Sequence, residues 1–536
     1  MRNEFVAFAV LSTLLVGGIA HFLWSPLWWI FIVLGPIIIL GFYDMLQSKH
    51  AIMRNFPILG RGRYIMEELR PKIYQYFIES DTNGTPISRI KRVVVYQRAK
   101  QQLDTTPFGT QLDVYAEGYE WLNHSIGSLD PHKLNPHPRV KVGGTHCRHP
   151  YDTSLLNVSA MSFGSLSKNA ILALNGGAKI GGFGHNTGEG GISKYHLENG
   201  GDLIFQFGTG YFGCRDEIGR FSPHAFQELV EDDRVRMVEL KLSQGAKPGH
   251  GGILPAHKNT KEIAAIRNLK PGKAILSPPF HTAFSTPIGL LEFVQQLRDL
   301  SYGKPIGFKL CLGWQYEFFA ICKAMLRTGI FPDFITVDGG EGGTGAAPLE
   351  FSNSVGMPYR DALAFVHDAL IGFELRDQIR VFASGKIITA FDMFKALALG
   401  ADVCCCARAM MLALGCIQAM ECNQNTCPTG VATQDPELVA GLSVADKKVR
   451  VANYHRETIK SFVELLAASG QGDHMLIDRN AVYRRISSNE VLTYAEIFPY
   501  IGRGCLLQED SIPDRYDKAM ALADPSSFRP RFIEVI

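Results

Sequence analysis

Short apolar runs rich in β-branched residues recur between residues 155 and 407, and glycines or small polar residues end each of them. Helical patterns separate the later runs. Alternating strands and helices imply parallel strands, and eight such units predict an α/β fold, the closed (β/α)8 TIM barrel. An open, doubly wound sheet is the alternative arrangement. The expected strands are residues 155–161, 178–186, 202–208, 235–242, 305–312, 333–339, 379–385 and 401–407.

Glycine is frequent, with 53 residues, and it concentrates just after the expected strands. Glycine lets backbone N–H groups approach a ligand closely, which suits a phosphate and a flat ring. Barrel enzymes keep their sites at this carboxyl-end face, with the usual phosphate site after strands seven and eight. A long insertion, residues 240–285, is expected to cover the same face. The glycine-rich segments are GHNTGEGG (184–191), KPGHGG (247–252), DGGEGGTGAAP (338–348) and ASGK (383–386).

The segment from Gly208 to Gly213 matches the dinucleotide-binding pattern G-x-G-x-x-G. A single match of this pattern is weak evidence. Because the segment lies in the third strand–helix unit and does not open a Rossmann half, it is interpreted as a turn.

Lys309 lies inside the fifth expected strand, in the otherwise apolar run PIGFKLCL. A buried lysine in a strand is costly unless it meets an anion or an electron-rich ligand. A lysine that faces outward along apolar surface is the alternative. We expect the ammonium group in the barrel mouth, where it would stabilise negative charge on a reduced flavin or a substrate.

Three cysteines, Cys416, Cys422 and Cys427, follow the last expected strand with the spacing C-x5-C-x4-C and a proline directly after. This pattern is closer to iron–sulfur ligation than to zinc, which requires a fourth ligand and more often C-x2-C spacing. Three ligands suit a cluster with three irons, whereas three unrelated core cysteines are the alternative. The chain has 11 cysteines, an odd number, and the run from Cys404 to Cys406 makes a poor disulfide framework. Reduced thiols favour the cytoplasmic side of a membrane.

From Phe5 to Tyr43 the chain has no Asp, Glu, Lys or Arg, and two tandem apolar segments are each long enough to cross a bilayer. Residues 1–45 are therefore expected to form a transmembrane helical hairpin. A cleaved signal peptide is the alternative, although two segments exceed a single signal core. The positive-inside tendency then places the catalytic domain in the cytoplasm. The basic residues that follow are Lys49, Arg54, Arg61, Arg63, Arg70 and Lys72.

The rest of the chain divides into a linker or cap region, residues 46–145, the barrel, residues 146–475, and a C-terminal extension, residues 476–536. The first of these regions contains a helical pattern around residues 64–78 and a possible strand, RVVVYQRA (92–99). The formal net charge of +2 gives no electrostatic case for nucleic-acid binding.

Several segments together resemble the synthase domain of glutamate synthases. CIQAMECNQNTCPTGVATQDPEL resembles their cluster segment, and other matching motifs fall in the same order over roughly residues 150–440. The whole chain resembles the stand-alone, membrane-anchored members of the FMN-binding glutamate synthase family. The other motifs are NVSAMSFGSLS, NTGEGG, QGAKPG with the following GG-LP, SPP, VDGGEGGTGAAP and GADV.

The resemblance implies an FMN in the barrel beside a [3Fe–4S] cluster held by Cys416, Cys422 and Cys427. Electrons would come from a ferredoxin-like or NAD(P)H-reductase-like donor, and 2-iminoglutarate would be reduced to L-glutamate. Candidate catalytic residues are Lys309, Glu189 and His250. Candidate FMN-binding residues are Ala160, Met161, Ser162, Gln206, Lys309, Gly343, Thr344, Gly345, Ser384, Gly385, Ala407 and Arg408.

The chain departs from the family pattern in three places. Met1 and Arg2 lead directly into the apolar run, where full synthases start with a glutaminase domain, so free ammonia or a partner's ammonia is expected as the nitrogen source. His250 replaces a glutamate of the family's PGEGG, and SPPFHTA keeps only His281 of the family's SPPPHHD. These changes leave two alternatives open: a membrane-coupled FMN dehydrogenase of another amino or oxo acid, and a non-catalytic redox sensor or scaffold.

Overall fold

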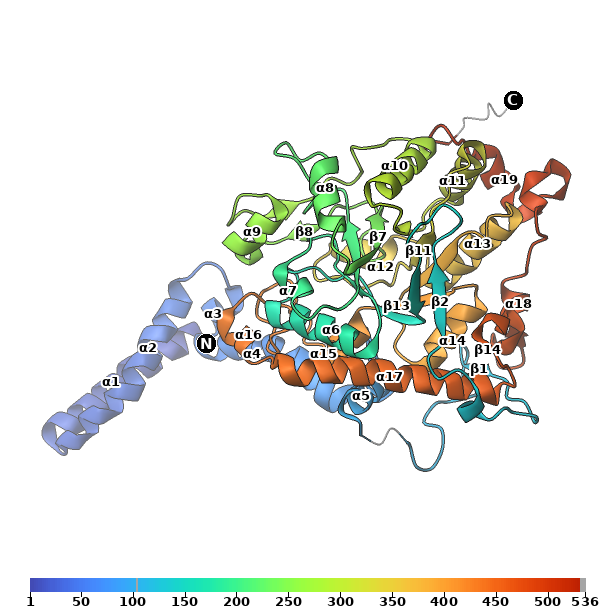
Figure 1. The fold of residues 1–536 in the computed structure, drawn as a ribbon. Coiled ribbons are helices and arrows are strands. Elements are labelled where there is room, and N and C mark those ends of the chain that lie inside the picture. The colour runs from blue at the N-terminus through green and yellow to red at the C-terminus, as the bar shows by residue number, and fades with distance from the viewer. Residues whose placement is uncertain (103–104, 531–536) are drawn as a thin grey trace, which may run out of the picture. The chain divides into compact units, whose positions relative to one another are not determined.

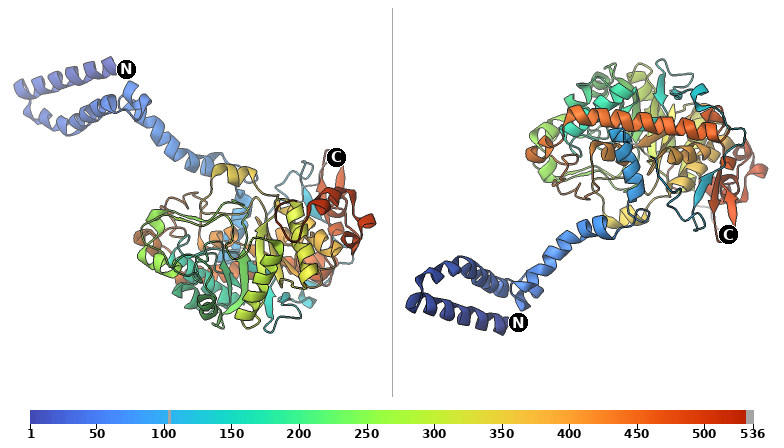
Figure 2. Two further views of the ribbon diagram at one scale, coloured as in Figure 1. Left: turned by 90° about the horizontal axis from the view of Figure 1, so that it is seen from above. Right: turned by 90° about the horizontal axis from the view of Figure 1, so that it is seen from below.

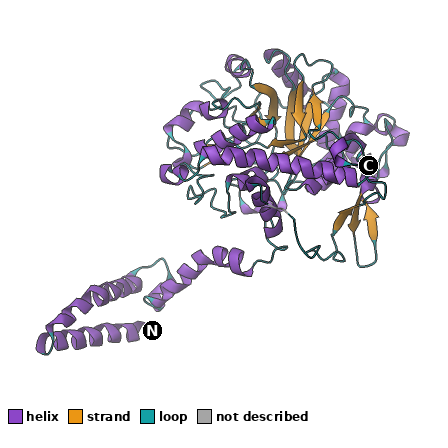
Figure 3. Ribbon diagram, turned by 60° about the horizontal axis from the view of Figure 1, so that its bottom comes forward, coloured by secondary structure: helices purple, strands orange, loops and turns teal. Residues whose placement is uncertain are grey.

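The computed structural model describes residues 1–102 and 105–530, which form two compact units, Met1–Gly84 and Thr85–Ile536. In the larger unit, eight parallel strands close into a barrel (Figures 1 and 3). The closed barrel is therefore confirmed, and the open sheet is excluded. In barrel order the strands are β4 (Leu156–Val158), β5 (His185–Asn186), β6 (Leu203–Phe207), β7 (Val235–Lys241), β10 (Ile306–Cys311), β11 (Phe334–Asp338), β12 (Arg380–Ser384) and β13 (Val403–Cys406).

Helices cover the outside of the barrel and bury one face each against the strands. The long helix α17 (Val444–Ala468) packs along α6 (Lys168–Gly181). In the right view of Figure 2, α17 is the long orange helix that crosses the molecule. A Cβ atom at Gly177 would overlap Val451, so glycine permits this close approach. The other barrel helices include α8 (Pro223–Val230), α10 (Pro287–Leu300), α11 (Gln315–Thr328), α13 (Tyr359–Gly372), α14 (Ala390–Ala398) and α15 (Arg408–Leu414).

Two expected strands are wrong in whole or in part. Of residues 178–186, only His185–Asn186 pairs as a strand, because α6 continues to Gly181 before a left-handed cap at Gly182. The possible strand at residues 92–99 is instead part of helix α5 (Arg89–Lys100). Val95 and Ala99 lie four residues apart and both are buried, and α5 packs against α17, so tertiary packing overrides the β-propensity of the valines.

The insertion after β7 is confirmed as a small substructure above the strand ends. Its two short strands, β8 (Ile253–Leu254) and β9 (Ile275–Leu276), pair antiparallel and flank helix α9 (Lys261–Arg267). The segment from Gly208 to Gly213 forms turns, and the next helix begins only at Pro223, which agrees with its interpretation as a turn.

A three-stranded sheet outside the barrel joins segments from both ends of the larger unit. β1 (Glu120–Leu122) pairs with β14 (Val482–Arg485), which in turn pairs with β15 (Val491–Thr493). The predicted C-terminal extension thus contributes β14 to a sheet with residues near 120. The units divide at Gly84, inside the region 46–145, and the finer domain boundaries stay a prediction.

The N-terminal unit begins with two helical segments of 21 and 22 residues, Arg2–Phe22 and Ser25–Leu46, which are long and apolar enough to cross a membrane. They comprise α1 (Arg2–Phe22), the 3-10 segment η1 (Ser25–Ile30) and α2 (Phe31–Leu46). A Cβ atom at Gly41 would overlap the Phe5 ring, so the two helices approach closely there. Figure 1 shows them side by side. A signal sequence near the N-terminus has the same length and composition.

Candidate functional site

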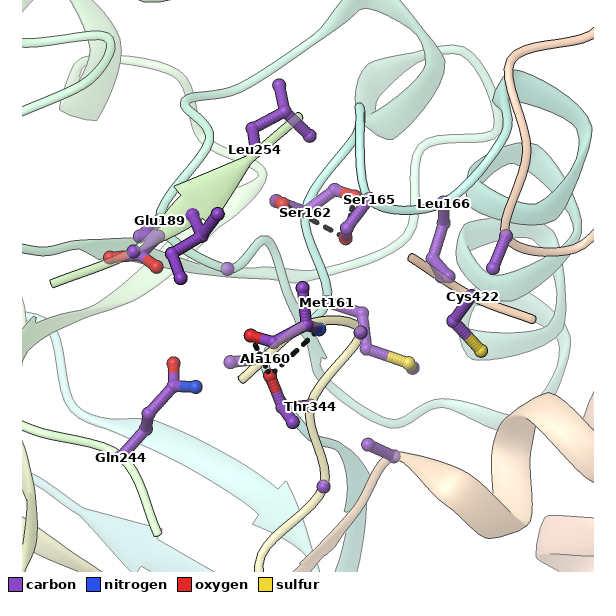
Figure 4. Close-up of a pocket in the computed structure, with 18 of the residues that line it drawn as sticks. Ala160, Met161, Ser162, Ser165, Leu166, Glu189, Gln244, Leu254, Thr344 and Cys422 are labelled. Atoms are coloured by element: carbon purple, nitrogen blue, oxygen red, sulfur yellow. Dashed lines mark hydrogen bonds between the residues drawn. The ribbon is translucent and has the colours of Figure 1, made fainter. Parts of the chain in front are cut away.

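A cavity of about 190 Å³ opens at the carboxyl ends of the barrel strands, beneath the insertion (Figure 4). A smaller cavity of about 40 Å³ adjoins it and lies against the ends of β12 and β13. The two cavities share six lining residues: Ala160, Lys309, Asp338, Gly343, Ala407 and Arg408. A ligand with one end in each cavity would therefore pass Lys309 and Arg408.

The residues expected to bind FMN come together at these two cavities. Ser384 and Gly385 line the smaller cavity. The others line the larger one: Ala160, Met161, Ser162, Gln206, Lys309, Gly343, Thr344, Gly345, Ala407 and Arg408. Each lies in a barrel strand or in the segment that follows one, so the parallel topology brings distant parts of the chain to one place. Their roles in binding stay predictions.

The larger cavity carries an excess of positive charge. Six cationic side chains line it, against the carboxylates of Glu189 and Asp338. Buried charges of one sign repel each other and disfavour their own ionised forms, so such a cavity favours an anionic ligand. The six are Lys241, Lys247, Lys258, Arg267, Lys309 and Arg408.

Lys309 lies in β10 between Lys241 of β7 and Thr336 of β11. Its side chain is buried and lines both cavities, so it faces the barrel mouth and not the helices. The ammonium nitrogen lies 3.1 Å from Oδ2 of Asp338. Burial alone would lower the pKa of Lys309, but the carboxylates of Asp338 and Glu239 outweigh burial and raise it. Lys309 is therefore a fixed positive charge.

Glu189 is in the glycine-rich loop after β5 and forms an ion pair with Lys241, with 2.8 Å between Oε1 and Nζ (Glu189 is labelled in Figure 4). Burial would raise the pKa of Glu189, but Lys241, with help from Lys247 and Arg267, lowers it. The carboxylate is thus ionised at neutral pH. The ion pair holds Lys241 in place, and the catalytic role expected for Glu189 stays a prediction.

Glu239 of β7 is an inward-facing residue that the sequence analysis missed. Its carboxylate accepts hydrogen bonds from Nδ2 of Asn186, at 2.7 Å, and from the side chains of Gln206 and Thr336. Glu239 and Lys241 are two residues apart, so they share the inner face of one strand. That alternation was visible in VRMVELKL and would have identified both residues.

Two further cations come from the insertion, which the sequence analysis treated only as a cover. The Lys247 ammonium donates to the carbonyl of Ala346 at 2.7 Å, and burial, followed by the charge of Lys241, lowers the pKa of Lys247 to about 8. Arg267 donates from Nη2 to the Phe163 carbonyl at 3.1 Å, and its buried Nε has no partner within the described structure. An unsatisfied guanidinium N–H beside a cavity is well suited to donate a hydrogen bond to an anionic ligand.

Lys258 connects the insertion to the cysteine segment. Its ammonium donates to the carbonyls of Cys422 at 2.7 Å and Ala432 at 2.8 Å, and lies 3.4 Å from the carbonyl of Ser165. These contacts fix the backbone on both sides of Cys427. Because Cys422 also lines the larger cavity, the cysteine segment and the ligand cavity are neighbours.

The three cysteines expected to hold a cluster lie in an irregular segment after α15. Cys416 accepts a contact of 3.4 Å from the Gln418 amide, and burial raises its pKa to about 11. Burial would also raise the pKa of Cys427, but the Thr429 hydroxyl and nearby backbone N–H groups outweigh burial and lower it. Within residues 1–102 and 105–530, no three potential ligands are arranged to hold a metal ion, so the cluster assignment stays a prediction.

His250, expected as a catalytic residue, is not among the residues that line either cavity. Its ring packs edge-on against Phe351 at 5.3 Å between centroids, and Nδ1 lies 2.8 Å from the Gly251 carbonyl. His281 is buried between the Tyr211 hydroxyl and the Lys241 carbonyl, and burial lowers its pKa to about 4. His281 is therefore neutral at physiological pH, and its contact with the Lys241 carbonyl helps to fix the backbone of Lys241.

The fold and this site define an α/β-barrel protein with a cationic ligand cavity at the carboxyl ends of its strands. The family model described as "Conserved region in glutamate synthase" matches residues 121–472, more than half of the chain, and the chain belongs to this family.

Several relatives of the chain carry glutamate synthase names. The chain is 38% identical over 481 residues to the "Glutamate synthase large subunit-like protein YerD" of Bacillus subtilis, covering 82% of this chain and 91% of that protein. It is 36% identical over 321 residues to the archaeal glutamate synthase (NADPH) of Methanocaldococcus jannaschii, covering 60% and 59%. It thus spans little more than half of the archaeal enzyme. Among solved structures, a flavocytochrome b2 variant with pyruvate bound aligns with a TM-score of 0.40 at 12% identity, over 78% of this chain and 85% of that one.

The lowered pKa of Lys247 predicts how anion binding depends on pH. Below pH 8 the ammonium is charged and attracts an anion, and above pH 8 it is increasingly neutral. The affinity for an anionic ligand should therefore fall as pH rises from 7 to 10, by up to about tenfold per unit. Calorimetry in buffers of different ionisation enthalpy should show proton uptake above pH 8. Lys247→Gln should bind more weakly at pH 7 and lose this proton uptake. An unchanged pH profile in that variant would assign the dependence to another group.

Proposed function

We propose that this protein is an oxidoreductase of the glutamate synthase type that uses FMN to reduce 2-iminoglutarate, formed from 2-oxoglutarate and ammonia, to L-glutamate. The observation that carries the proposal is the pair of joined cavities with an excess of buried cations, in a chain that belongs to this family. The reaction acts on a CH–NH2 bond, and the relatives named glutamate synthase (NADPH) carry the same activity in their names.

The residues present fit a bound FMN. The smaller cavity offers the Ser384 hydroxyl, the side chain of Lys386 and Arg408 to a phosphate. A Cβ atom at Gly345 would meet nothing within 4 Å, so open space remains above the loop after β11. When bound, FMN would supply the electrons of the reduction. Lys309 lies at the junction of the cavities, where its positive charge would act on both the flavin and the acid substrate.

The larger cavity is suited to a dicarboxylate. Lys241, Lys247 and Arg267 are cations on three different segments, and they present N–H groups to one volume. Glu189 fixes Lys241, and the free Nε of Arg267 gains a partner when an anion binds. Fixed cations bind both carboxylates of 2-oxoglutarate and keep the substrate carbon in position for reduction. Among the described residues Arg267 has no ion pair, so a carboxylate can bind it without displacing another one.

A [3Fe–4S] cluster would be held by Cys416, Cys422 and Cys427, next to the larger cavity. The N–H and hydroxyl groups that lower the pKa of Cys427 favour its thiolate form, which is the form that ligates iron. Lys258 would place a positive charge beside the ligated segment. Electrons would come from a ferredoxin-like protein or an NAD(P)H-dependent reductase.

The two apolar N-terminal helices favour a second candidate function, a membrane-coupled FMN dehydrogenase that oxidises another amino or oxo acid. In either case, α1 and α2 would anchor the protein and the basic residues after them would keep the barrel in the cytoplasm.

Anaerobic turnover separates these functions. Purified full-length protein with an artificial reductant, 2-oxoglutarate and ammonium should form L-glutamate, measured by mass spectrometry, whereas a panel of other oxo acids should react poorly. Substrate-dependent quinone reduction without glutamate formation would favour the dehydrogenase. Absence of turnover with every donor and acceptor would favour a redox sensor or scaffold.

In the same assay, Lys309→Met should retain FMN but lose turnover about a hundred- to a thousandfold, since one preorganised charge is removed. Lys460→Met, an exposed lysine of α17, serves as the control.

Lys386 provides a test of the phosphate site, because its backbone has a φ of +47°, a conformation that favours glycine. Lys386→Gly should relieve this strain and leave the unfolding temperature unchanged or higher. It should nevertheless weaken FMN binding about 10- to 100-fold, because a charged contact to the phosphate is lost. Riboflavin, which lacks the phosphate, should bind both forms equally. Lys386→Met keeps the backbone strain and should lose the same FMN affinity. Equal FMN affinity in all three proteins would place the phosphate elsewhere.

Cys422→Ser tests the cluster. The variant should lose iron, sulfide and the electron paramagnetic resonance signal of a three-iron cluster while it still binds FMN. Cys505→Ser, in a half-exposed position in the C-terminal region, should keep all of them. Full iron and sulfide content in Cys422→Ser would contradict the ligand assignment.

A further inference from the structure

Helix α4 (Leu59–Ile73), together with the π-helical turn η2 (Tyr74–Ile78), carries an exposed apolar stripe. At 3.6 residues per turn, its residues fall within about one third of the helix circumference, so they share one side of the helix. Side chains of this size rarely remain in water as a continuous stripe. The stripe consists of Leu59, Ile65, Met66, Leu69, Ile73 and Phe77, which are between 38% and 85% exposed.

Basic residues border the stripe on both sides. At 3.6 residues per turn, Arg63 and Arg70 follow one edge and Lys72 follows the other. Glu67 and Glu68 lie farther round, on the polar side, and the Arg63 guanidinium lies 3.8 Å from the Glu67 carboxylate. Cations at the borders of an apolar stripe are typical of helices that lie in a membrane surface, because the long side chains reach up to lipid phosphates.

The opposite side of α4 packs within its own unit. Gly60 is buried, and a Cβ atom there would overlap the backbone of Met53 in helix α3 (Ala51–Asn55). Arg61 pairs with Asp44 at the end of α2, with 2.7 Å between Nη2 and Oδ1, and Asp44 also accepts the Ile58 amide at 3.1 Å. Asp44 is fully buried. These contacts fix the start of α4 and direct the apolar stripe away from α3 and from the Asp44 corner.

We propose that α4 and η2 lie on the cytoplasmic surface of a bilayer, with the stripe in the boundary between headgroups and acyl chains and with Arg63, Arg70 and Lys72 against anionic lipid phosphates. The inference rests on the proposed membrane insertion of α1 and α2. α4 begins 13 residues after α2 ends at Leu46, and Figure 1 shows it turning away from the direction of α2. A helix that starts at the membrane surface and turns aside meets lipid first. The flanking cations match the negative charge of that surface.

Photo-crosslinking in the full-length protein tests this surface. A benzophenone amino acid replaces Met66 or Leu69 in the stripe, and Tyr64 or Glu68 on the polar side as matched controls. The protein is reconstituted in nanodiscs of phosphatidylcholine and phosphatidylglycerol, irradiated, and examined by mass spectrometry. Lipid adducts should form at Met66 and Leu69, and none should form at Tyr64 and Glu68.

The charge on the adducts tests the basic border. Adducts at Met66 should be enriched in phosphatidylglycerol over its share of the bilayer, and Arg70→Gln with Lys72→Gln should lower the ratio of phosphatidylglycerol to phosphatidylcholine adducts to about that of the bilayer, by up to roughly fivefold per residue. Crosslinks from Met66 to the barrel or to a second copy of the chain, or equal lipid adducts on both sides of α4, would overturn the proposal. Carbonate extraction of the unmodified protein separately tests the insertion of α1 and α2, so the failure of one proposal is distinguishable from the failure of the other.

Discussion

Closure of the barrel is the constraint on which the site depends. Cys406 of β13 pairs with Val158 of β4, so the last strand lies beside the first and all eight carboxyl ends surround one opening. Without this pairing, the loop after β4 and the loop after β13 would lie at opposite edges of an open sheet. Ala160 and Arg408, separated by some 250 residues of chain, line both cavities only because the sheet closes.

Charge balance inside the opening then decides its chemistry. Lys309 and Lys241 each face a carboxylate, and Lys247 and Lys258 donate to backbone carbonyls, so the cost of burying these ammonium groups is largely offset. Carbonyls compensate a cation without cancelling its charge. The cavity therefore keeps a net positive potential, and a bound anion would neutralise part of this excess charge.

The sequence predicted the barrel well because strand periodicity and glycine-rich strand ends are local signals. Lys309 could be found for the same reason, as one charge in an apolar run. The strand prediction for residues 92–99 was wrong because their helix depends on the packing of α5 against α17, which lies some 350 residues farther along the chain. Arg267 could not be placed, since nothing local shows that a helix in an insertion points its arginine into the barrel mouth. His250 was chosen from its position in a motif, and a motif does not fix the direction of a side chain.

The N-terminal unit carries two apolar helices and the larger unit a cationic cavity, and this difference bears on what the proposed membrane anchor would serve. The ligand for which the cavity is suited is small, anionic and soluble in water, so a bilayer is not needed to deliver it. Electron transfer differs, because an electron donor or acceptor bound to the same membrane as the proposed anchor would be confined to that surface, which would raise its effective concentration. The buried Asp44–Arg61 pair fixes the corner between α2 and α4 and so gives the chain a defined exit from the hairpin. If α1 and α2 insert as proposed, the component that the membrane would supply is an electron-transfer partner and not the acid substrate.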